Sequence, residues 1–377
     1  MLSREGCLQR QNDLIRFLPE KCDLILITDP PYLLYFNNLW IEQNSTNQNS
    51  LNLFVFNENE RIVFTDDSLF ESASTSYAET IISSRWYGKK YPVFNRKEVV
   101  VREFSLWLDK FRPKKIAAEL VSLPGIIQKA VEDRGILLTD ISRELNQMRV
   151  RKYPDEIAEI RRIAGNASRT MDIVADSAKA GMSEWEIFGS LYKEFISIHK
   201  EQTSPVGDLV SDYRVSGFPR QRAVQTGDLL IIDFSPYVNG YRADIARTIC
   251  VNSLPTNSQQ EYSDILQESL RHTEKLLCPD IPGKVIYDSF LLFFRKNKID
   301  KYYISHAGHG IGLKHPERPF FVLNCDETVP QGAVITLEPG LYNNDIGYMR
   351  IEDNYLITET GFEKLSFHRK TLKQTSY

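Results

Sequence analysis

The sequence lacks the features that mark membrane, secreted and nucleic-acid-binding proteins. No apolar run approaches the roughly 20 residues of a membrane-spanning helix, and Met1 to Gly6 do not begin the apolar segment of a secretory signal. The net charge of −4 and a pI near 6.0 leave no strong basic surface for nucleic acid. We therefore expect a protein whose partners include neither a membrane nor a nucleic acid.

Cysteine is also scarce. The chain has five cysteines, an odd number, and no two of them have the spacing of a zinc knuckle. Scattered cysteines of this kind are typical of reduced, structural thiols. We therefore expect reduced thiols and a cytoplasmic protein.

The length and the local patterns predict two domains. A chain of 377 residues exceeds one ordinary domain. Residues 23–28 form an apolar run that predicts a buried strand, and residues 51–65 predict a strand pair across a polar turn. Pro154 fits the first turn of a long helix that ends before Gly181. We predict an α/β domain over residues 1–146, a linker over 147–154, a larger domain over 155–368 and a tail over 369–377.

The most informative local pattern lies between residues 228 and 244. Asn239-Gly240 separates two apolar runs and is typical of the two-residue loop of a β-hairpin. In that register Asp233 faces Ala246, so Asp233 and Asp244 are diagonal neighbours on one face, roughly 7–8 Å apart at the backbone. Asp233 ends a run of four aliphatic residues, and a buried carboxylate without a partner is costly. The pattern therefore favours an ion bound between the two aspartates.

A glycine-rich segment, residues 306–315, contains three of the six histidines: His306, His309 and His315. Glycine permits close approach of backbone segments. Histidine is the commonest metal ligand and transfers protons near neutral pH. One histidine alone would more often be structural, whereas this cluster indicates function.

Two glutamates complete the set. Glu338 ends an apolar strand at a Pro-Gly turn, and Glu352 shares a strand face with Arg350 while Ile351 points to the other face. Either glutamate alone would more often be a turn residue or an ion-pair partner. Combined with the earlier segments they offer four carboxylates and one imidazole, which suit two hard or borderline divalent cations: Asp233, Asp244, His309, Glu338 and Glu352. If these side chains converge, the expected chemistry is hydrolysis by water activated on two metal ions.

In order and spacing, these segments resemble the signature of the pita-bread-fold metallopeptidases, which include Xaa-Pro aminopeptidase, prolidase, methionine aminopeptidase and creatinase. The matching segments are residues 233–244, 308–312, 337–340 and 350–353. Residues 27–36 resemble the creatinase/prolidase N-terminal domain more weakly. Methionine aminopeptidases lack that domain and creatinase lacks the ligands, so the Xaa-Pro peptidase branch fits best. The resemblance implies an α+β protein, with a curved antiparallel sheet covered by helices (the pita-bread fold) after a smaller α/β domain.

The resemblance also implies an activity, the hydrolysis of the bond between an N-terminal residue and proline by an aminopeptidase or a dipeptidase, and a homodimer. Asp233 would bind one ion, His309 and Glu338 the other, and Asp244 and Glu352 would bridge both. Mn²⁺ is the first expectation, and Co²⁺, Zn²⁺ or Fe²⁺ would also suit these ligands.

The resemblance assigns four residues to catalysis. Glu338 would accept the proton of the attacking water and pass it to the leaving amine. Arg350 would orient the carboxylate of Asp233 or Glu352. His306 and His315 would face the substrate.

Three features depart from the family pattern. Active peptidases carry a histidine upstream of the first metal aspartate, whereas residues 215–220 contain none, and Ser216 or Arg220 stands nearest. The two flanking histidines each lie one residue closer to His309 than is usual in the family. Phe234-Ser235 replaces the usual glycine after the first aspartate. These changes leave the ligand set intact and alter the substrate side.

Two alternatives stay open. One is a family member that keeps its metal, is weakly active or inactive, and binds a peptide or a protein. The other is a metal hydrolase that acts on a non-peptide amide. The altered substrate side favours the first alternative, and the complete ligand set favours the peptidase.

Overall fold

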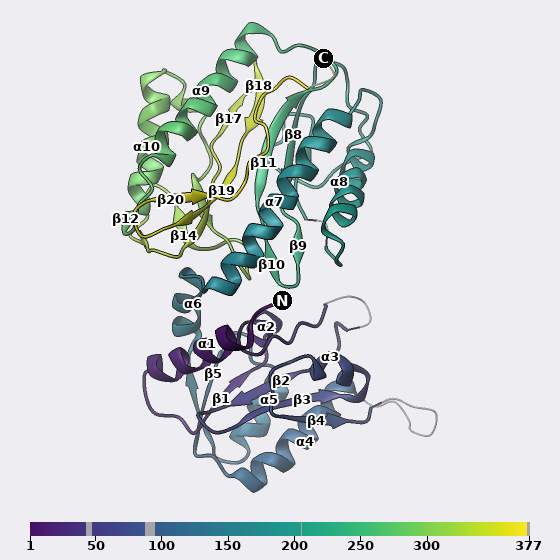
Figure 1. Cartoon of the computed structure of the whole chain (residues 1–377), viewed down its shortest axis with the longest axis vertical. Helices are drawn as coiled ribbons and strands as arrows, with labels where there is room; N and C mark the ends of the chain where they lie inside the picture. Colours follow the sequence, from purple (N-terminus) through teal and green to yellow (C-terminus); the bar gives the residue numbers. More distant parts are fainter. Residues whose placement is uncertain (43–46, 87–94, 205, 375–377) are drawn as a thin grey trace. The chain divides into compact units, whose positions relative to one another are not determined.

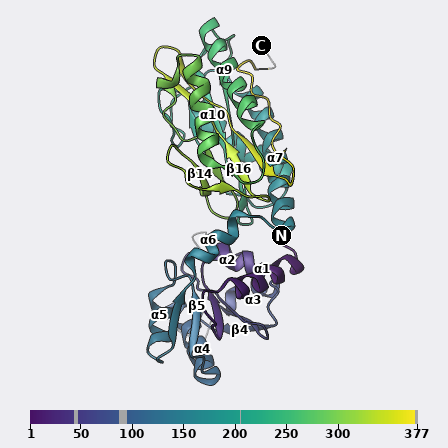
Figure 2. The same ribbon diagram turned by 90° about the vertical axis from the view of Figure 1, so that its left-hand side faces the viewer.

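The computed structural model describes residues 1–42, 47–86, 95–204 and 206–374. The chain divides into two compact units, Met1–Arg149 and Val150–Tyr377. None of the described helices combines the length and the apolar composition needed to cross a bilayer. Figure 1 shows both units, and Figure 2 shows them after a quarter turn.

The first unit is a six-stranded mixed sheet with helices on its faces. The strand order is β4-β3-β2-β1-β5-β6. Its strands are β1 (Leu24–Ile27), β2 (Leu53–Phe56), β3 (Arg61–Asp66), β4 (Thr80–Ser84), β5 (Lys115–Ala118) and β6 (Leu137–Asp140). Its helices are α1 (Arg4–Phe17), α2 (Pro30–Asn37), α3 (Phe70–Ser74), α4 (Arg96–Phe111), α5 (Gly125–Glu132) and α6 (Ser142–Val150), with a 3₁₀ turn, η1 (Asp67–Leu69).

The central strand β1 lies in a part of the sheet that is covered on both faces. All four of its residues are buried. Leu24 and Leu26 join the core formed with α4 and α5, and Phe56 of the neighbouring strand meets Phe36 of α2 with ring centroids 5.7 Å apart. A strand covered on both faces is continuously apolar. The predicted strand over residues 23–28 and the predicted strand pair over 51–65 are confirmed.

The second unit is built from antiparallel strands flanked by two pairs of helices. Its helices are α7 (Pro154–Ser177), α8 (Glu184–His199), α9 (Asn257–Glu274) and α10 (Gly283–Lys296), with a 3₁₀ turn, η2 (Asp300–Tyr302). The strands of its first half are β7 (Leu209–Val210), β8 (Leu229–Phe234), β9 (Tyr237–Val238), β10 (Tyr241–Arg242) and β11 (Ile245–Cys250). Those of its second half are β12 (Ile281–Pro282), β13 (Gly308–Gly310), β14 (Glu317–Phe321), β15 (Thr328–Val329), β16 (Val334–Leu337), β17 (Gly340–Asn343), β18 (Gly347–Arg350), β19 (Asp353–Ile357) and β20 (Phe362–Lys364).

The strands of the second unit form two main sheets that an isolated β-bridge connects. One sheet has the order β11-β8-β7 and the other β14-β13-β16-β19-β20. An isolated antiparallel bridge between Ala246 and Glu352 connects them. In Figure 1, α7 and α8 lie beside β8 and β11, whereas α9 and α10 flank the second half. The helix predicted from Pro154 is confirmed as α7.

The predicted linker and residues 369–374 of the predicted tail pack against other parts of the second unit or continue a helix. The predicted linker, residues 147–154, begins inside α6, so only residues 151–153 lie between α6 and α7. Of the predicted tail, Arg369 pairs with Asp176 of α7 at 2.6 Å, and buried Gln374 donates hydrogen bonds to Ala175 and Ala178 backbone oxygens at 2.7 and 2.8 Å. Residues 369–374 are therefore packed against α7.

A buried ion pair fixes the start of the second unit to β14. Lys152 Nζ lies 2.6 Å from Glu317 Oε1, and the two side chains are 1% and 2% exposed. The backbone N–H of Lys152 also donates to Gly332 O at 2.9 Å. Removing one partner of such a pair leaves an uncompensated buried charge, which is strongly destabilising.

We therefore expect Lys152→Met to lower the free energy of unfolding by about 3–5 kcal/mol. Urea unfolding of the metal-free proteins would measure it. The double variant Lys152→Met/Glu317→Gln removes both charges and should regain most of the loss. Lys284→Met is the matched control, because Lys284 and Asp288 form a pair that is 50% and 35% exposed, and it should cost less than about 1 kcal/mol. Equal effects of Lys152→Met and Lys284→Met would contradict the prediction.

Candidate metal centre

Strand pairing gathers three carboxylates around one alanine. In the β8–β11 ladder Asp233 is paired with Ala246, as the hairpin register predicts, because Asn239-Gly240 forms the expected loop. Ala246 also bridges Glu352. Asp244 lies two residues before Ala246 and shares its face. Single oxygen atoms of Asp233, Asp244 and Glu352 all lie within 4.8 Å of one another.

The second half of the unit supplies His309 and Glu338. His309 lies on β13, and Glu338 follows β16 and donates its backbone N–H to Ala307 O at 3.0 Å. Gly308 permits this approach, because its φ is +142° and a Cβ there would lie 2.1 Å from Thr336 O. His309 Nε2 lies 3.3 Å from Glu338 Oε1.

The two sets of residues form one centre. His309, Glu338 and Glu352 form a second group whose ligand atoms lie within 4.8 Å of one another, and Glu352 belongs to both groups. All five residues that the sequence predicted as ligands are therefore brought together. Each of them is at most 9% exposed.

Burial and repulsion between neighbouring carboxylates favour the protonated forms of three acids in this centre. Burial raises the pKa of Asp233 to about 7, although Arg350 opposes the shift. Burial also raises the pKa values of Glu338 and Glu352 well above their ordinary range, and the neighbouring carboxylates add to the shift. Among the described residues, Glu352 Oε1 is a buried oxygen that has no hydrogen-bond donor. Carboxylates in this situation must bind protons or cations.

The donor set fits divalent metal ions. Burial lowers the pKa of His309 to about 4, which keeps the imidazole neutral, as a metal ligand must be. His309 Nδ1 lies 3.0 Å from Gly310 O, a backbone contact that fixes the ring and leaves Nε2 facing Glu338. Four carboxylates and one neutral imidazole, with one orphaned oxygen among them, therefore match two hard or borderline cations.

Arg350 supports the Asp233 side of the centre. Its guanidinium donates to Asp233 Oδ2, to Val215 O at 2.6 Å and to Tyr342 Oη at 3.2 Å. Asp208 Oδ2 lies 3.8 Å from the same group. Of the two carboxylates predicted to contact Arg350, the structure shows the contact with Asp233.

The two flanking histidines reach the centre despite their shortened spacing. His306 Nδ1 lies 3.4 Å from Glu338 Oε1, and the side chain is 45% exposed. His315 Nε2 lies 2.6 Å from Asp244 Oδ2, and the side chain is 30% exposed. Burial acts to raise the pKa of Asp244, yet the hydrogen bond with His315 and the nearby His315 and His309 lower it overall.

The segment that lacks the expected histidine runs along the same cavity. Ser216 lines a cavity of about 820 Å³ that also contains the five predicted ligands. Arg220 is not among its lining residues, and its backbone N–H donates to Glu184 Oε2 at 2.8 Å. Of the two candidates for the missing position, Ser216 is therefore the one that faces the centre. The apolar part of the lining consists of Val206, Val215, Phe218, Pro316, Phe320, Val322 and Tyr342.

Sequence reasoning missed Asn354, which fixes the position of Asp244. The Asp244 N–H donates to Asn354 Oδ1 at 3.1 Å, and Asn354 Nδ2 donates to Asp244 O. The side-chain amide of Asn354 therefore makes two hydrogen bonds to the backbone of Asp244. These bonds link β19 to the residue that precedes β11. An amide inside the buried strand 353–357 was the available signal, because buried amides need partners.

We expect Asn354→Ala to weaken metal binding about 10- to 100-fold, because residues that orient metal ligands contribute on this scale. Calorimetric titration of the metal-free protein with Mn²⁺ would measure it. Asn297→Ala is the control, because Asn297 is exposed at the end of α10 and its amide donates only to Phe293 O. Unchanged Mn²⁺ affinity in Asn354→Ala would show that Asp244 keeps its position without the amide.

A second cluster of one histidine and two carboxylates already contains a positively charged side chain. Glu159, His199 and Glu201 offer ligand atoms within 4.8 Å of one another. Arg162 donates to Glu159 and to Glu201 at 2.6 Å each, so a cation already occupies this cluster. It is therefore an ion-pair network, unlike the centre around Glu352.

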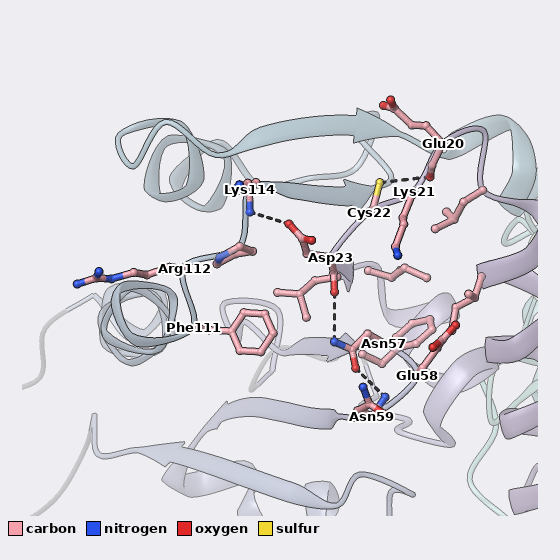
Figure 3. Close-up of a pocket in the computed structure, with 16 residues that line it drawn as sticks. Glu20, Lys21, Cys22, Asp23, Asn57, Glu58, Asn59, Phe111, Arg112 and Lys114 are labelled. Atoms are coloured by element: carbon pink, nitrogen blue, oxygen red, sulfur yellow. Dashed lines mark hydrogen bonds between the residues drawn. The ribbon is translucent and has the colours of Figure 1, made fainter.

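The first unit has a cavity of its own, about 890 Å³, at the ends of strands β1, β2 and β5. Figure 3 shows its lining, in which Asn57 Nδ2 donates to Asp23 O and the Lys114 N–H donates to the Asp23 carboxylate. Within the described part of the chain, none of the groups of potential metal ligands includes a residue of this cavity.

Known proteins resemble this chain in sequence and in fold. An Xaa-Pro dipeptidase of Pyrococcus furiosus is 24% identical over 368 residues, which are 95% of this chain and 97% of that protein. An Xaa-Pro dipeptidase of Pyrococcus horikoshii is 33% identical over 258 residues, 65% of this chain and 71% of that protein. The solved structure of an X-Pro aminopeptidase from Thermotoga maritima has a TM-score of 0.81, with 21% identity, over 97% of this chain and 98% of that one.

These likenesses confirm the predicted pita-bread fold of the second unit and the α+β class. The sequence profile of metallopeptidase family M24 matches residues 158–359, which are more than half of the chain. The matched region begins in α7 and ends just after β19, so it contains every residue of the centre described above. The chain therefore belongs to metallopeptidase family M24.

Proposed function

We propose that the protein is a metal-dependent exopeptidase that hydrolyses the bond between an N-terminal residue and proline. The observation that carries this proposal is the convergence of five buried ligands in one cavity. The two archaeal relatives, both Xaa-Pro dipeptidases, support the proline preference. The non-catalytic alternative is not favoured, because the Xaa-Pro dipeptidase of Pyrococcus furiosus aligns with 95% of this chain.

The cavity suits a small peptide. Its lining is largely apolar away from the ligands, and apolar pockets with a few polar groups are typical of sites that enclose small ligands. Phe218 and Phe320 are both in the lining and partly exposed, at 74% and 39%. They offer surfaces for the proline ring or for the side chain before it.

Asp233, Asp244, His309, Glu338 and Glu352 would hold the metal. Two divalent ions would supply a nucleophilic water at neutral pH and polarise the scissile carbonyl. Mn²⁺ is our first candidate, and Co²⁺, Zn²⁺ and Fe²⁺ also suit the donors.

Four residues would carry the remaining chemistry. Glu338 would accept a proton from the attacking water, and its Oε1 lies 3.4 Å from His306 Nδ1, which could move that proton on. Arg350 would hold Asp233 in place through the contact described above. His315 lies at the border of the cavity beside Asp244, where it can meet the substrate.

The test is an assay of purified, Mn²⁺-loaded protein on Xaa-Pro dipeptides and Xaa-Pro tripeptides, with Ala-Ala as the control substrate. We expect turnover of at least one proline substrate, its loss after chelation and its return with Mn²⁺. Preference for the dipeptide or for the tripeptide would distinguish a dipeptidase from an aminopeptidase. No turnover of any of them, with two equivalents of metal bound, would defeat the proposal and favour a peptide-binding protein.

The homodimer stays a prediction that light scattering would test, and the cytoplasmic location also stays a prediction.

A further inference from the structure

His315 occupies a place beside the centre that the five-ligand set does not explain. Its Nε2 lies 2.6 Å from Asp244 Oδ2, and His309 Nε2 lies 3.8 Å from the same oxygen. The two imidazole rings are nearly perpendicular, at 86°, with centroids 4.9 Å apart. Asp244, His309 and His315 form a third group whose ligand atoms lie within 4.8 Å of one another.

The surrounding structure holds His315 in this place. β14 begins two residues later and pairs with β13, which carries His309. The register shifts between His309 and Gly310, and the chain between the strands brings His315 back toward Asp244. Glu317, the first residue of β14, is tied to Lys152 by the buried ion pair described above. The position of His315 is therefore fixed by buried contacts, although the ring itself is partly exposed.

The directions of the nitrogen atoms point to a cation. His309 Nδ1 lies 3.0 Å from Gly310 O and so carries the proton of a neutral ring. Its Nε2 then presents a lone pair toward Asp244 and Glu338, which are themselves acceptors when ionised. His315 Nε2 points to the same Asp244 oxygen. His315 Nε2 can reach this oxygen as the N–H donor of a hydrogen bond or, with its proton on Nδ1, as a ligand that shares an ion with Asp244.

We propose that His315 is a sixth protein ligand of the metal centre, so that one ion is held by Asp244, His309 and His315. This inference rests on the proposed function of the same site. It makes the two ions chemically unlike, because one gains a second imidazole while the other keeps mainly carboxylates. Imidazole suits Zn²⁺ and Fe²⁺, whereas carboxylates suit Mn²⁺, so the ion beside His315 should prefer Zn²⁺ to Mn²⁺.

The competing explanation is that His315 only donates a hydrogen bond to Asp244. Two substitutions separate the explanations. His315→Ala removes both the ligand and the hydrogen bond, whereas His315→Asn keeps an N–H donor for Asp244 and removes the imidazole ligand. His272→Ala is the matched control, because His272 is exposed on α9 and belongs to none of the ligand groups found among the described residues.

Calorimetric titration of the metal-free proteins with Zn²⁺ is the first measurement. We expect His315→Ala and His315→Asn each to weaken one of two binding events about tenfold or more, because each removes an imidazole ligand. His272→Ala should leave both events within about threefold. Wild-type affinity in His315→Asn would overturn the proposal, because the hydrogen bond alone would then explain the contact.

A crystal structure of the wild-type protein grown with Zn²⁺ is the second measurement. We expect His315 Nε2 at about 2.0–2.1 Å from one ion, the usual length of a zinc–imidazole bond. Two bound ions with His315 Nε2 hydrogen-bonded only to Asp244 would overturn this inference and leave the proposed function intact. Absence of bound metal at Asp233 and Glu352 would overturn both.

Discussion

Glu338→Gln should lower kcat on an Xaa-Pro substrate by about 10²–10⁴-fold, the range for the loss of a general acid–base group. Glu338 is 7% exposed, and its Oε1 lies 3.3 Å from His309 Nε2 and 3.4 Å from His306 Nδ1. Burial raises its pKa well above the ordinary range in the metal-free protein, and bound cations would favour the ionised carboxylate that accepts a proton. Glutamine keeps one oxygen for a metal ion and cannot accept the proton.

The measurement pairs steady-state kinetics with the metal content of each variant. Glu359→Gln is the matched control, because Glu359 is exposed in the same unit, and it should leave kcat unchanged. A fall in kcat with two equivalents of metal retained would support the role of Glu338 in proton transfer. A fall that only follows lost metal would assign Glu338 to metal binding alone. Unchanged kcat with full metal would contradict both roles.

Local patterns predicted the parts of the site that neighbouring residues determine. The Asn239-Gly240 loop sets the register of its hairpin, so the pairing of Asp233 with Ala246 followed from the sequence. Glu338 was expected at the end of a strand, and β16 ends at Leu337. These predictions succeeded because turn chemistry and strand alternation act over a few residues.

Long-range contacts account for what the sequence left open. The bridge from Ala246 to Glu352 joins residues 106 positions apart, and nothing in either strand alone specifies it. The hydrogen bond between Asn354 and Asp244 spans 110 positions, and the ion pair of Lys152 with Glu317 spans 165. The shortened spacing of His306 and His315 suggested an altered substrate side, whereas the fold brings both rings to the ligands. The sequence could therefore predict the members of the centre but not the contacts that hold them.

The stability of the metal-free protein should fall as the pH rises from 7 to 8. Burial raises the pKa of Asp233 to about 7 and the pKa values of Glu338 and Glu352 well above their ordinary range. The unfolded chain releases these protons near pH 4, so above pH 7 these carboxyls hold protons in the folded state that the unfolded state lacks. Four histidines with lowered pKa values act in the opposite direction, mainly below about pH 6.5, where the unfolded imidazoles are protonated: His199, His306, His309 and His368. Stability contributed by a raised pKa is present at low pH and is lost as the pH rises through the folded value. Asp244 has a lowered pKa, so its contribution is already complete at pH 5.

Metal should reverse this trend, because cations bind the deprotonated carboxylates and are favoured as the pH rises. A free-ion concentration 1,000-fold above the Kd stabilises by about 4 kcal/mol per site, and for a unit of this size about 2–4 °C of Tm corresponds to each kcal/mol. Thermal unfolding at pH 5, 6, 7 and 8, with EDTA and with Mn²⁺, would therefore show a Tm difference that widens to roughly 8–16 °C per occupied site at the upper end. Asp233→Asn removes one of the raised groups and should flatten the EDTA curve, whereas Glu359→Gln should leave it unchanged. A metal-free Tm that rises from pH 7 to pH 8 would mean that charges within the protein already balance the carboxylates, and the electrostatic argument for two cations would fail.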